Sequence, residues 1–446
     1  MDFTQGNIVK QILRFSIPLL FGTIFQQVYS ITDSIIIGNI LGSNSLAVIG
    51  ATMPIIQVSS TLAIGITMGI SVVISQKVGQ DLTNDVKNTI KTSLIFFSFF
   101  SICLSLFGFF FASYFTRLIK VPPQIIKEAT SYLMIIMLGS FGKIEYNVCN
   151  AVFRGLGNSL IPLIILIVSA LLNIVFDLIA ILVFNLGIAG TALATIISQL
   201  LSYITSNIIL NRKYYQYRYG HFNKTLLSQI IKIGLPSGLK AMLYWGGYTF
   251  ISTTINQFGA VIVAAFGIAS KIDSFVQTPH SSLNACLASF VGQNMGIGNL
   301  DRIKKAVKTS RTIGYIVAFI STVAVYVFAG SLLSLFTPDQ QVIKEGIKYL
   351  RIVSVFYLVY SFQEVIQGVA VGSGHTIILM ISTITAMWLV RIPIASILSA
   401  RIGILGVWIS IPSGWFVASM FTNIFYYSGK WKNNVLASTP VSKNII

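Results

Sequence analysis

The stretch KNTIKTS at residues 87–93 recurs in altered form as KKAVKTS at residues 304–310, which is 217 positions further along the chain. Further matches keep nearly the same spacing: Pro18 with Pro236, Val78-Gly79-Gln80 with Val291-Gly292-Gln293, Tyr132 with Tyr349, Gly155-Leu156-Gly157 with Gly372-Ser373-Gly374, and Gly187-Ile188-Ala189-Gly190 with Gly403-Ile404-Leu405-Gly406. Matches that follow in order at one spacing indicate an internal structural repeat. The sequence therefore predicts two halves with the same architecture.

The composition identifies the chain as a membrane protein. Of its 446 residues, 54% are hydrophobic and only 9% are charged, and the mean hydropathy is +0.81. Soluble domains usually carry about 25% charged residues, so a soluble enzyme is excluded. The apolar segments predict an all-α fold with twelve transmembrane helices in two pseudo-symmetric six-helix lobes. We expect an N-terminal lobe over 1–210, a cytoplasmic linker over 211–228, a C-terminal lobe over 229–428 and a cytoplasmic tail over 429–446.

Basic residues outnumber acidic residues by 30 to 12, which gives a formal net charge of +18. They lie in short stretches between the apolar segments, where they meet anionic lipid headgroups and orient the chain. We therefore expect membrane lipid and no nucleic acid as a partner, the plasma (inner) membrane as the location, and both termini in the cytoplasm. The cysteines Cys103, Cys149 and Cys286 show no metal-ligand spacing, so no cofactor, zinc site or disulfide framework is expected.

Acidic residues are rare inside the apolar segments, where an ionised side chain costs about 2.5 to 3.5 kcal/mol at a helix centre. Asp33 lies fifteen residues after Pro18, which lets the first helix bend. Asn173 and Asp177 are four residues apart and share one face of the fifth helix. Two carboxylates that meet there could not both ionise cheaply, which suits a proton carrier, whereas added amide and hydroxyl oxygens would suit Na⁺. The alternative is a set of structural contacts between helices.

The second half lacks an equivalent acid pair, so we expect ion coupling in the first half. The second helix of the second half is nevertheless too polar to face only lipid. Residues that could line a water-filled cavity in the two halves are Gln57, Asp273, Gln277, His280, Asn284 and Glu364. For His280 a polar wall position is favoured over a proton relay, and for Glu364 a satisfied structural carboxylate is favoured over a position in the cavity.

Several longer motifs, spread over nearly the full length, carry a family resemblance. They are Pro18 with the following QQVYSITDSIIIG that contains Asp33, LAVIGA from Leu46, NIVFD from Asn173 to Asp177, GIAGTALATIISQ from Gly187, FVGQNMGIGN from Phe290, and Arg391-Ile-Pro with GILGVW from Gly403. In this order and spacing they resemble the multidrug and toxic compound extrusion (MATE) family of secondary transporters. The resemblance implies two six-helix lobes that form a V around a central cavity, which a rocking motion exposes to either side. It also implies export coupled to inward flow of H⁺ or Na⁺.

Within this family the sequence is similar to the branch named for DNA-damage-inducible protein F, which places its ion pocket in the N-terminal lobe. That resemblance implies an ion-coupling pocket and a bending proline. The pocket residues are Asp33, Tyr132, Asn173, Asp177 and Thr195, the proline is Pro18, and a Na⁺ ion would be held by Asp33, Asn173, Asp177 and Thr195. The NorM-like branch adds acids in the C-terminal lobe, but the first of these is missing, because residues 229–257 hold Lys240 and no acid.

The resulting hypothesis is a monomeric antiporter for multidrug efflux. It would export small amphipathic, often cationic organic compounds in exchange for H⁺ or Na⁺ by alternating access. A flippase for lipid-linked precursors in the same superfamily is the nearest alternative, since a polar cavity wall also suits a lipid headgroup. An ion channel and a membrane enzyme are the alternatives from other classes, and the chain shows no clustered catalytic residues that favour an enzyme.

Overall fold

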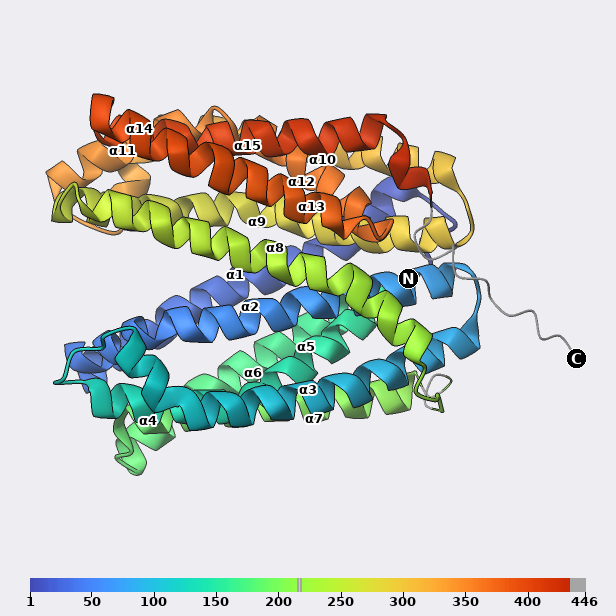
Figure 1. Cartoon of the computed structure of the whole chain (residues 1–446), viewed down its shortest axis with the longest axis horizontal. Helices are drawn as coiled ribbons and strands as arrows, with labels where there is room; N and C mark the ends of the chain where they lie inside the picture. The colour runs from blue at the N-terminus through green and yellow to red at the C-terminus, as the bar shows by residue number, and fades with distance from the viewer. Residues whose placement is uncertain (215, 217–218, 434–446) are drawn as a thin grey trace, which may run out of the picture. The chain divides into compact units, whose positions relative to one another are not determined.

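The computed structural model describes residues 1–214, 216 and 219–433, and the regular elements in these ranges are all helices (Figure 1). The first half contains α1 (Ile8–Leu41), α2 (Ser43–Gly79), α3 (Thr83–Leu118), α4 (Ile126–Leu138), α5 (Ser140–Gly155), α6 (Leu160–Leu178), the π-helix η1 (Ile179–Val183) and α7 (Gly187–Lys213). The second half contains α8 (Lys224–Asn256), α9 (Ala260–Gly296), α10 (Leu300–Ser334), α11 (Gln340–Ser354), α12 (Tyr357–Gly372), α13 (Thr376–Thr383), the π-helix η3 (Ile384–Arg391), α14 (Ile392–Ile402), α15 (Ile404–Tyr427) and the short 3-10 helix η4 (Lys430–Lys432).

Some of these helices are pieces of one longer rod. The pairs α4–α5, α6–η1 and α11–α12 and the run α13–η3–α14 follow one another with at most two residues between them. With these pieces joined and the short η4 left aside, the described ranges contain twelve rods, six in each half. The breaks occur in the fourth and fifth rod of both halves, so the irregularities also repeat.

The rods have the length and polarity of membrane-spanning helices. In the described part of the chain, nine spans are long and apolar enough to cross a bilayer, and the pair α11 and α12, bent by 53°, is a tenth candidate. The rods that do not qualify, α4–α5 and α8, carry the charged residues Lys143, Glu145, Lys232 and Lys240. The prediction of an all-α integral membrane protein is confirmed.

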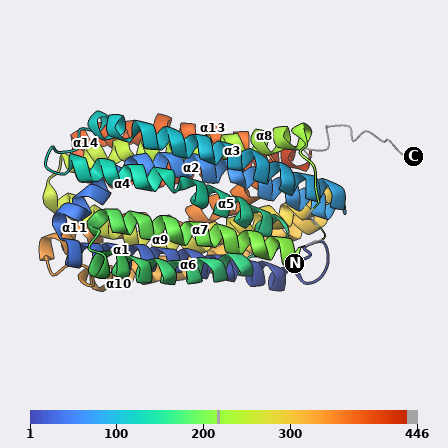
Figure 2. The same ribbon diagram turned by 90° about the horizontal axis from the view of Figure 1, so that it is seen from below.

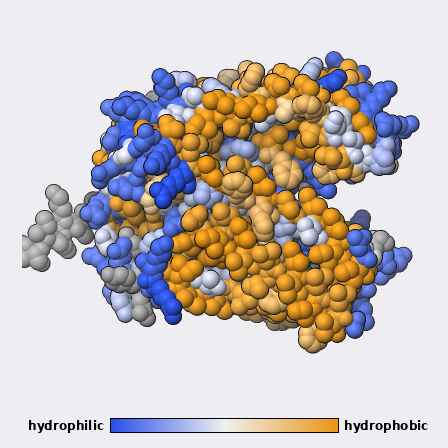
Figure 3. All heavy atoms as spheres, turned by 180° about the vertical axis from the view of Figure 1, so that it is seen from behind, coloured by the Kyte–Doolittle hydropathy of each residue, from blue (hydrophilic) through white to orange (hydrophobic). Residues whose placement is uncertain are grey.

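The outer side chains support the same conclusion. Large apolar residues stay exposed, for example Phe99 and Phe110 of α3 at 70% and 73%. In each unit, hydrophobic side chains cover the middle of the helices and hydrophilic ones gather toward the helix ends (Figure 3). A band of this kind is what a bilayer would cover, because it is far larger than the apolar patches on soluble proteins.

The repeat is also visible in the backbone. Gly42 before α2 and Gly259 before α9 have φ angles of 83° and 90° with ψ near 180°, a conformation that is open essentially only to glycine. The glycines after the fourth rods, Gly157 and Gly374, have φ angles of 76° and 85°. Both pairs keep the spacing of the sequence repeat, so the two halves share their turns as well as their helix order.

The chain divides into two compact units. One unit contains Met1 and Pro18–Gly234, and the other contains Asp2–Ile17 and the chain from Leu235 onward. The divisions lie inside helices α1 and α8, directly before Pro18 and one residue before Pro236. Each unit therefore contains the start of the helix that continues in the other unit.

In the unit that contains Pro18–Gly234, α5 is central. It packs against α2 and α3 on one side and α7 on the other, as Figure 2 also shows, and α7 packs in turn against α6. The start of α8 joins this unit through Gly234, where a Cβ would lie 2.3 Å from the carbonyl oxygen of Ile66. In the other unit, α9 packs against α10, α11 and α12, and α15 packs against α12 and α14.

Candidate functional site

The structure brings Asp33 of α1 close to Asn173 and Asp177 of α6. All three belong to the unit that contains Pro18–Gly234. Asn173 and Asp177 leave the same face of α6, because residues four apart on a helix are neighbours. Asn173 is 2% exposed and Asp177 is fully buried, whereas Asp33 is partly exposed. Of the two carboxyl groups, that of Asp33 is therefore the more accessible one.

Asn173 connects three helices through its side-chain amide. The hydroxyl group of Tyr29, one turn before Asp33 on α1, hydrogen-bonds with this amide. In the orientation that satisfies both ends of the amide, Asn173 Nδ2 donates to Asp177 Oδ2 at 3.0 Å and Asn173 Oδ1 accepts from the Thr195 backbone N–H at 3.2 Å. Asn173 thus links α1, α6 and α7 at one point beside the two acids.

The carboxyl groups of Asp33 and Asp177 lie close enough to interact with each other. Two ionised carboxylates at short range repel each other, so a proton or another cation between them is favourable. Tyr29 and Tyr132 lie close enough to interact electrostatically with both carboxyl groups. Asp177 Oδ1 is buried and has no hydrogen-bond partner in the described part of the chain. The arrangement can hold a proton or, with the amide and hydroxyl oxygens nearby, a hard cation such as Na⁺.

The backbone beside the acid pair is irregular. Helix α6 ends at Leu178, one residue after Asp177, and continues as the π-helix η1. π-Helical turns are rare and occur frequently at functional sites. The fifth rod of the second half contains a longer π-helix, η3, which ends at the buried Arg391. The π-helix is therefore a feature of the fifth rod in both halves, but η3 does not lie at the repeat position of η1, and the position that corresponds to Asp177 at a spacing of 217 is Ile394.

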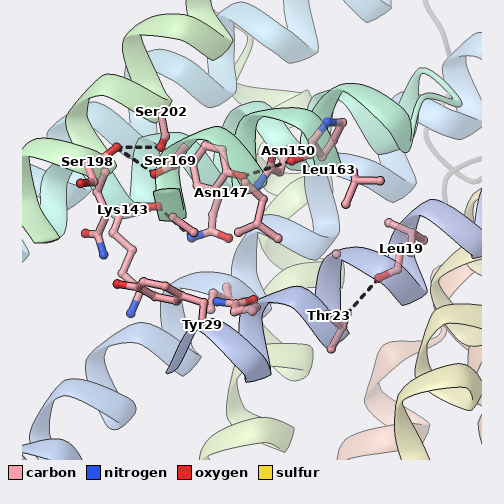
Figure 4. Close-up of a pocket in the computed structure, with 18 of the residues that line it drawn as sticks. Leu19, Thr23, Tyr29, Lys143, Asn147, Asn150, Leu163, Ser169, Ser198 and Ser202 are labelled. Atoms are coloured by element: carbon pink, nitrogen blue, oxygen red, sulfur yellow. Dashed lines mark hydrogen bonds between the residues drawn. The ribbon is translucent and has the colours of Figure 1, made fainter. Parts of the chain in front are cut away.

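A cavity of about 380 Å³ lies beside the acid pair. Tyr29, Asn173 and Thr195 belong both to the surroundings of the acids and to the cavity lining. Figure 4 shows Lys143, Asn147 and Asn150 on one helix, across the cavity from α1. A change in the charge of the acid pair would therefore be felt directly at the cavity wall.

The predicted cavity residues of α9 are largely buried within their unit. Gln277 Nε2 and the hydroxyl group of Tyr349 each donate to Asp273 Oδ2 at 3.2 Å, and Asp273 is 4% exposed. His280 is 1% exposed, and its ring stacks on Tyr360 with 5.8 Å between the ring centroids. These contacts hold the side chains against neighbouring helices, and their position in a transport cavity stays a prediction.

Glu364 belongs to a second polar cluster in the same unit. Asn284 Nδ2 donates to Glu364 Oε2 at 2.8 Å, and Gln367 Nε2 donates to Glu364 Oε1 at 3.2 Å. The ammonium group of Lys240 donates to the side-chain oxygen of Gln367. Both carboxylate oxygens of Glu364 are therefore hydrogen-bonded. Gln57 of α2, the remaining candidate, is partly buried, and the place of these residues in a cavity also stays a prediction.

The sequence analysis missed the charged residues of α5. Lys143 and Arg154 line the cavity. Glu145 is fully buried, and neither of its carboxylate oxygens has a geometrically sound hydrogen bond in the described ranges. The sequence did contain a sign of these residues. They lie in or next to the fourth membrane rod, α4–α5, where an ionised side chain is as costly as it is at Asp33.

The chain is similar to known proteins over most of its length. The model of the MatE family matches residues 18–179 and 236–397. Two proteins of Bacillus subtilis (strain 168) align with it: the probable multidrug resistance protein YpnP, 30% identical over 97% of both chains, and the probable multidrug resistance protein YoeA, 27% identical over 96% of this chain and 95% of the relative.

A solved structure described as the outward-facing conformation of a multidrug resistance MATE family transporter of the MOP superfamily has the same fold. Its TM-score is 0.89 at 24% sequence identity, and the match covers 96% of this chain and 97% of that one. The matched family segments begin at Pro18 and Pro236, next to the positions where the two compact units divide. The two-lobe fold expected from the repeat is confirmed by this match.

Proposed function

The chain belongs to the MatE family of membrane transporters, and we propose that it is an antiporter that exports amphipathic, often cationic organic compounds in exchange for H⁺ or Na⁺. Family membership makes it a multi-pass membrane protein and a transporter rather than an enzyme. The proposal further assigns it to the plasma membrane, with both termini in the cytoplasm, as a monomer surrounded by lipid. Its place in the branch named for DNA-damage-inducible protein F stays a prediction.

The observation that carries the proposal is the acid pair of Asp33 and Asp177. Two carboxyl groups that lie close together, one of them fully buried, are favoured when a proton or cation neutralises their charge. Asn173 joins this pair to α6 and α7 and to Tyr29 of α1. Binding or release of one cation therefore changes the forces between three helices at a single point, which is what coupling requires.

Movement would be focused on α1. Pro18 lacks a backbone N–H, so it leaves one carbonyl of the preceding turn without its helical partner and makes this the easiest place to bend. Pro18 and Tyr29 both line the cavity. Binding of a proton or Na⁺ to the acid pair from outside would draw the part of α1 after Pro18, which carries Asp33, toward α6. This movement would reshape the cavity and release the substrate.

Ethidium export from proteoliposomes tests the proposal. The full chain is energised separately by a pH gradient and by a sodium gradient, and the Asp33→Asn variant is measured under the same conditions. We expect one gradient to drive export and Asp33→Asn to abolish it, because the amide cannot take up a proton or supply a charged ligand. Asp301→Asn is the matched control, since Asp301 is 84% exposed and forms a surface ion pair with Lys304.

Unchanged export by Asp33→Asn, with the variant inserted and monodisperse, would exclude the acid pair as the coupling site. Export that needs neither gradient would exclude antiport. No export under either gradient would also count against the proposal and would direct the search to lipid substrates.

A further inference from the structure

One face of α5 places positive charge along the cavity wall. Lys143, Asn147, Asn150 and Arg154 follow one another at intervals of four, three and four residues, so they lie on the same side of the helix. All four line the cavity of about 380 Å³, and Figure 4 shows the first three of them along α5. Neither aspartate nor glutamate occurs among the described lining residues. The wall therefore carries two basic side chains without an acidic one.

Neither base has an acidic partner. Lys143 Nζ donates to Ser60 Oγ of α2 at 2.7 Å, which is a neutral acceptor. Arg154 Nε is buried and has no hydrogen-bond partner among the residues that the structure describes, and the Tyr146 hydroxyl lies close enough to interact with its charge. Within residues 1–214, 216 and 219–433, no ion pair includes Lys143 or Arg154.

An unpaired basic side chain in a membrane protein is costly unless it meets an anion or water. Lys143 keeps one hydrogen bond to a hydroxyl group, but Arg154 has a fork of five donors that matches a carboxylate, sulfonate or phosphate group. Arg154 also stands in the last turn of α5, where the helix dipole favours a positive charge. A guanidinium stays ionised in proteins because of its high intrinsic basicity, so Arg154 can meet an anion.

One part of the cavity wall is apolar. Leu19 of α1 and Pro162, Leu163 and Leu166 of α6 contribute to it, while Thr23 and Gln26 of α1 add polar groups, and Figure 4 shows Leu19 and Thr23 together on α1. Pockets of roughly 300 to 1,000 Å³ with apolar walls and a few polar groups take ligands of drug size. The cavity thus presents one apolar side, one basic side and, beyond Tyr29 and Asn173, the acid pair.

We propose that this cavity binds amphipathic compounds that carry an anionic group, and that Arg154 holds this group while Lys143 keeps the wall positive. The inference rests on the proposed transport function and names the substrate class of the same unit. The cationic group of such a compound would face the acid pair, so the preferred ligand is a zwitterion with an apolar ring system.

Two matched dyes test the proposal: a rhodamine with a free carboxylate, and the methyl ester of the same rhodamine, which keeps only the positive charge. Their binding to the purified full chain in detergent is followed by fluorescence polarisation, without any ion gradient. We expect the carboxylate dye to bind about ten-fold more tightly than the ester, as one charge-assisted bidentate contact allows. Arg154→Gln should bring the two affinities together, and Arg154→Lys should keep part of the difference.

Arg117→Gln is the control, because Arg117 is an exposed arginine outside the cavity, and it should keep the full preference. Equal affinities in the unmodified chain, a preference for the ester, binding of neither dye, or an undiminished preference in folded Arg154→Gln would overturn the proposal. The dye-binding titration does not depend on gradient-driven ethidium export. A failure of the transport function and a failure of the anion site therefore give different results.

Discussion

We predict that the substitution Arg302→Ala releases the N-terminal segment, residues 4–11, from its contacts with α10. Arg302 of α10 contacts four acceptors of this segment, which its Nε–H and the two N–H groups of Nη2 can serve with at most three full hydrogen bonds. Its Nε donates to Phe3 O at 2.8 Å, and its Nη2 lies 2.7 Å from Gln5 O, 2.9 Å from Gly6 O and 2.9 Å from Gln11 Oε1. The guanidinium also lies over the Phe290 ring at 5.4 Å from its centroid. Arg302 therefore makes most of the polar contacts that tie residues 4–11 to α10.

The size of the effect follows from the exposure of these bonds. Two of the contacts are exposed and two are part-buried, so each hydrogen bond contributes about 0.5 to 1 kcal/mol, the lower part of the usual range. Three such bonds stabilise the segment by about 1.5 to 3 kcal/mol, which corresponds to more frequent local opening by roughly 10- to 140-fold. Phe3 keeps its own hydrogen bond from N–H to Gln293 Oε1 at 2.8 Å, so the change should be confined to residues 4–11.

Hydrogen exchange followed by mass spectrometry measures this opening in the peptide that covers residues 4–11. Lys304→Ala is the matched control, because the ion pair of Lys304 with Asp301 is exposed by 52% and 84% and is worth about 0.2 to 1 kcal/mol at most. Exchange in Arg302→Ala that differs from the unmodified chain by less than about three-fold would refute the additive reasoning. It would mean that apolar packing alone holds the segment.

Two further predictions concern stability. Gly69→Ala should destabilise its unit by about 1 to 3 kcal/mol, because the new Cβ would lie 2.2 Å from the carbonyl oxygen of Ile230; Gly50→Ala, whose Cβ meets nothing within 4 Å, should show no such loss of thermal stability. Lys77→Met should lower the free energy of unfolding by denaturant by about 1 to 2 kcal/mol, because it leaves the Asp85 carboxylate without its ion-pair partner. Lys77 Nζ lies 2.8 Å from Asp85 Oδ2, and the lysine side chain is only 8% exposed. An unchanged midpoint for either Gly69→Ala or Lys77→Met would contradict the contact on which that prediction depends.

The rods and their repeat could be predicted because both depend on local properties. Apolar length specifies a membrane helix, and the turns that follow need glycine at Gly42 and Gly259. The breaks could not be predicted. The interruption at Gly139 and the π-helices η1 and η3 depend on how neighbouring rods pack, since a Cβ on Gly139 would lie 2.1 Å from the Ile196 side chain. Such contacts join residues far apart in the sequence.

The acid pair was accessible from the sequence because a carboxylate in an apolar segment is costly enough to need a reason. Tyr29 was not, since a tyrosine in a membrane helix costs little and only the fold brings its hydroxyl group to Asn173. Lys143 and Arg154 carried the same signal of cost as Asp33. The sequence could not show that both side chains line the same cavity, because that depends on how α5 packs beside α1, α6 and α7.

The charges of the acid pair and of the α5 wall have different consequences for a bound zwitterion. While the pair lacks a cation, its negative charge attracts the positive group of the ligand, and Arg154 attracts the anionic group. Loading a proton or Na⁺ removes only the first attraction, because Arg154 stays positively charged. The affinity for a purely anionic ligand would rise when the cation binds to the acid pair, which opposes exchange. The affinity for a ligand with a positive group would fall at that moment. Antiport and the basic wall are therefore compatible only if the exported compound carries a positive group that reaches Tyr29 and Asn173.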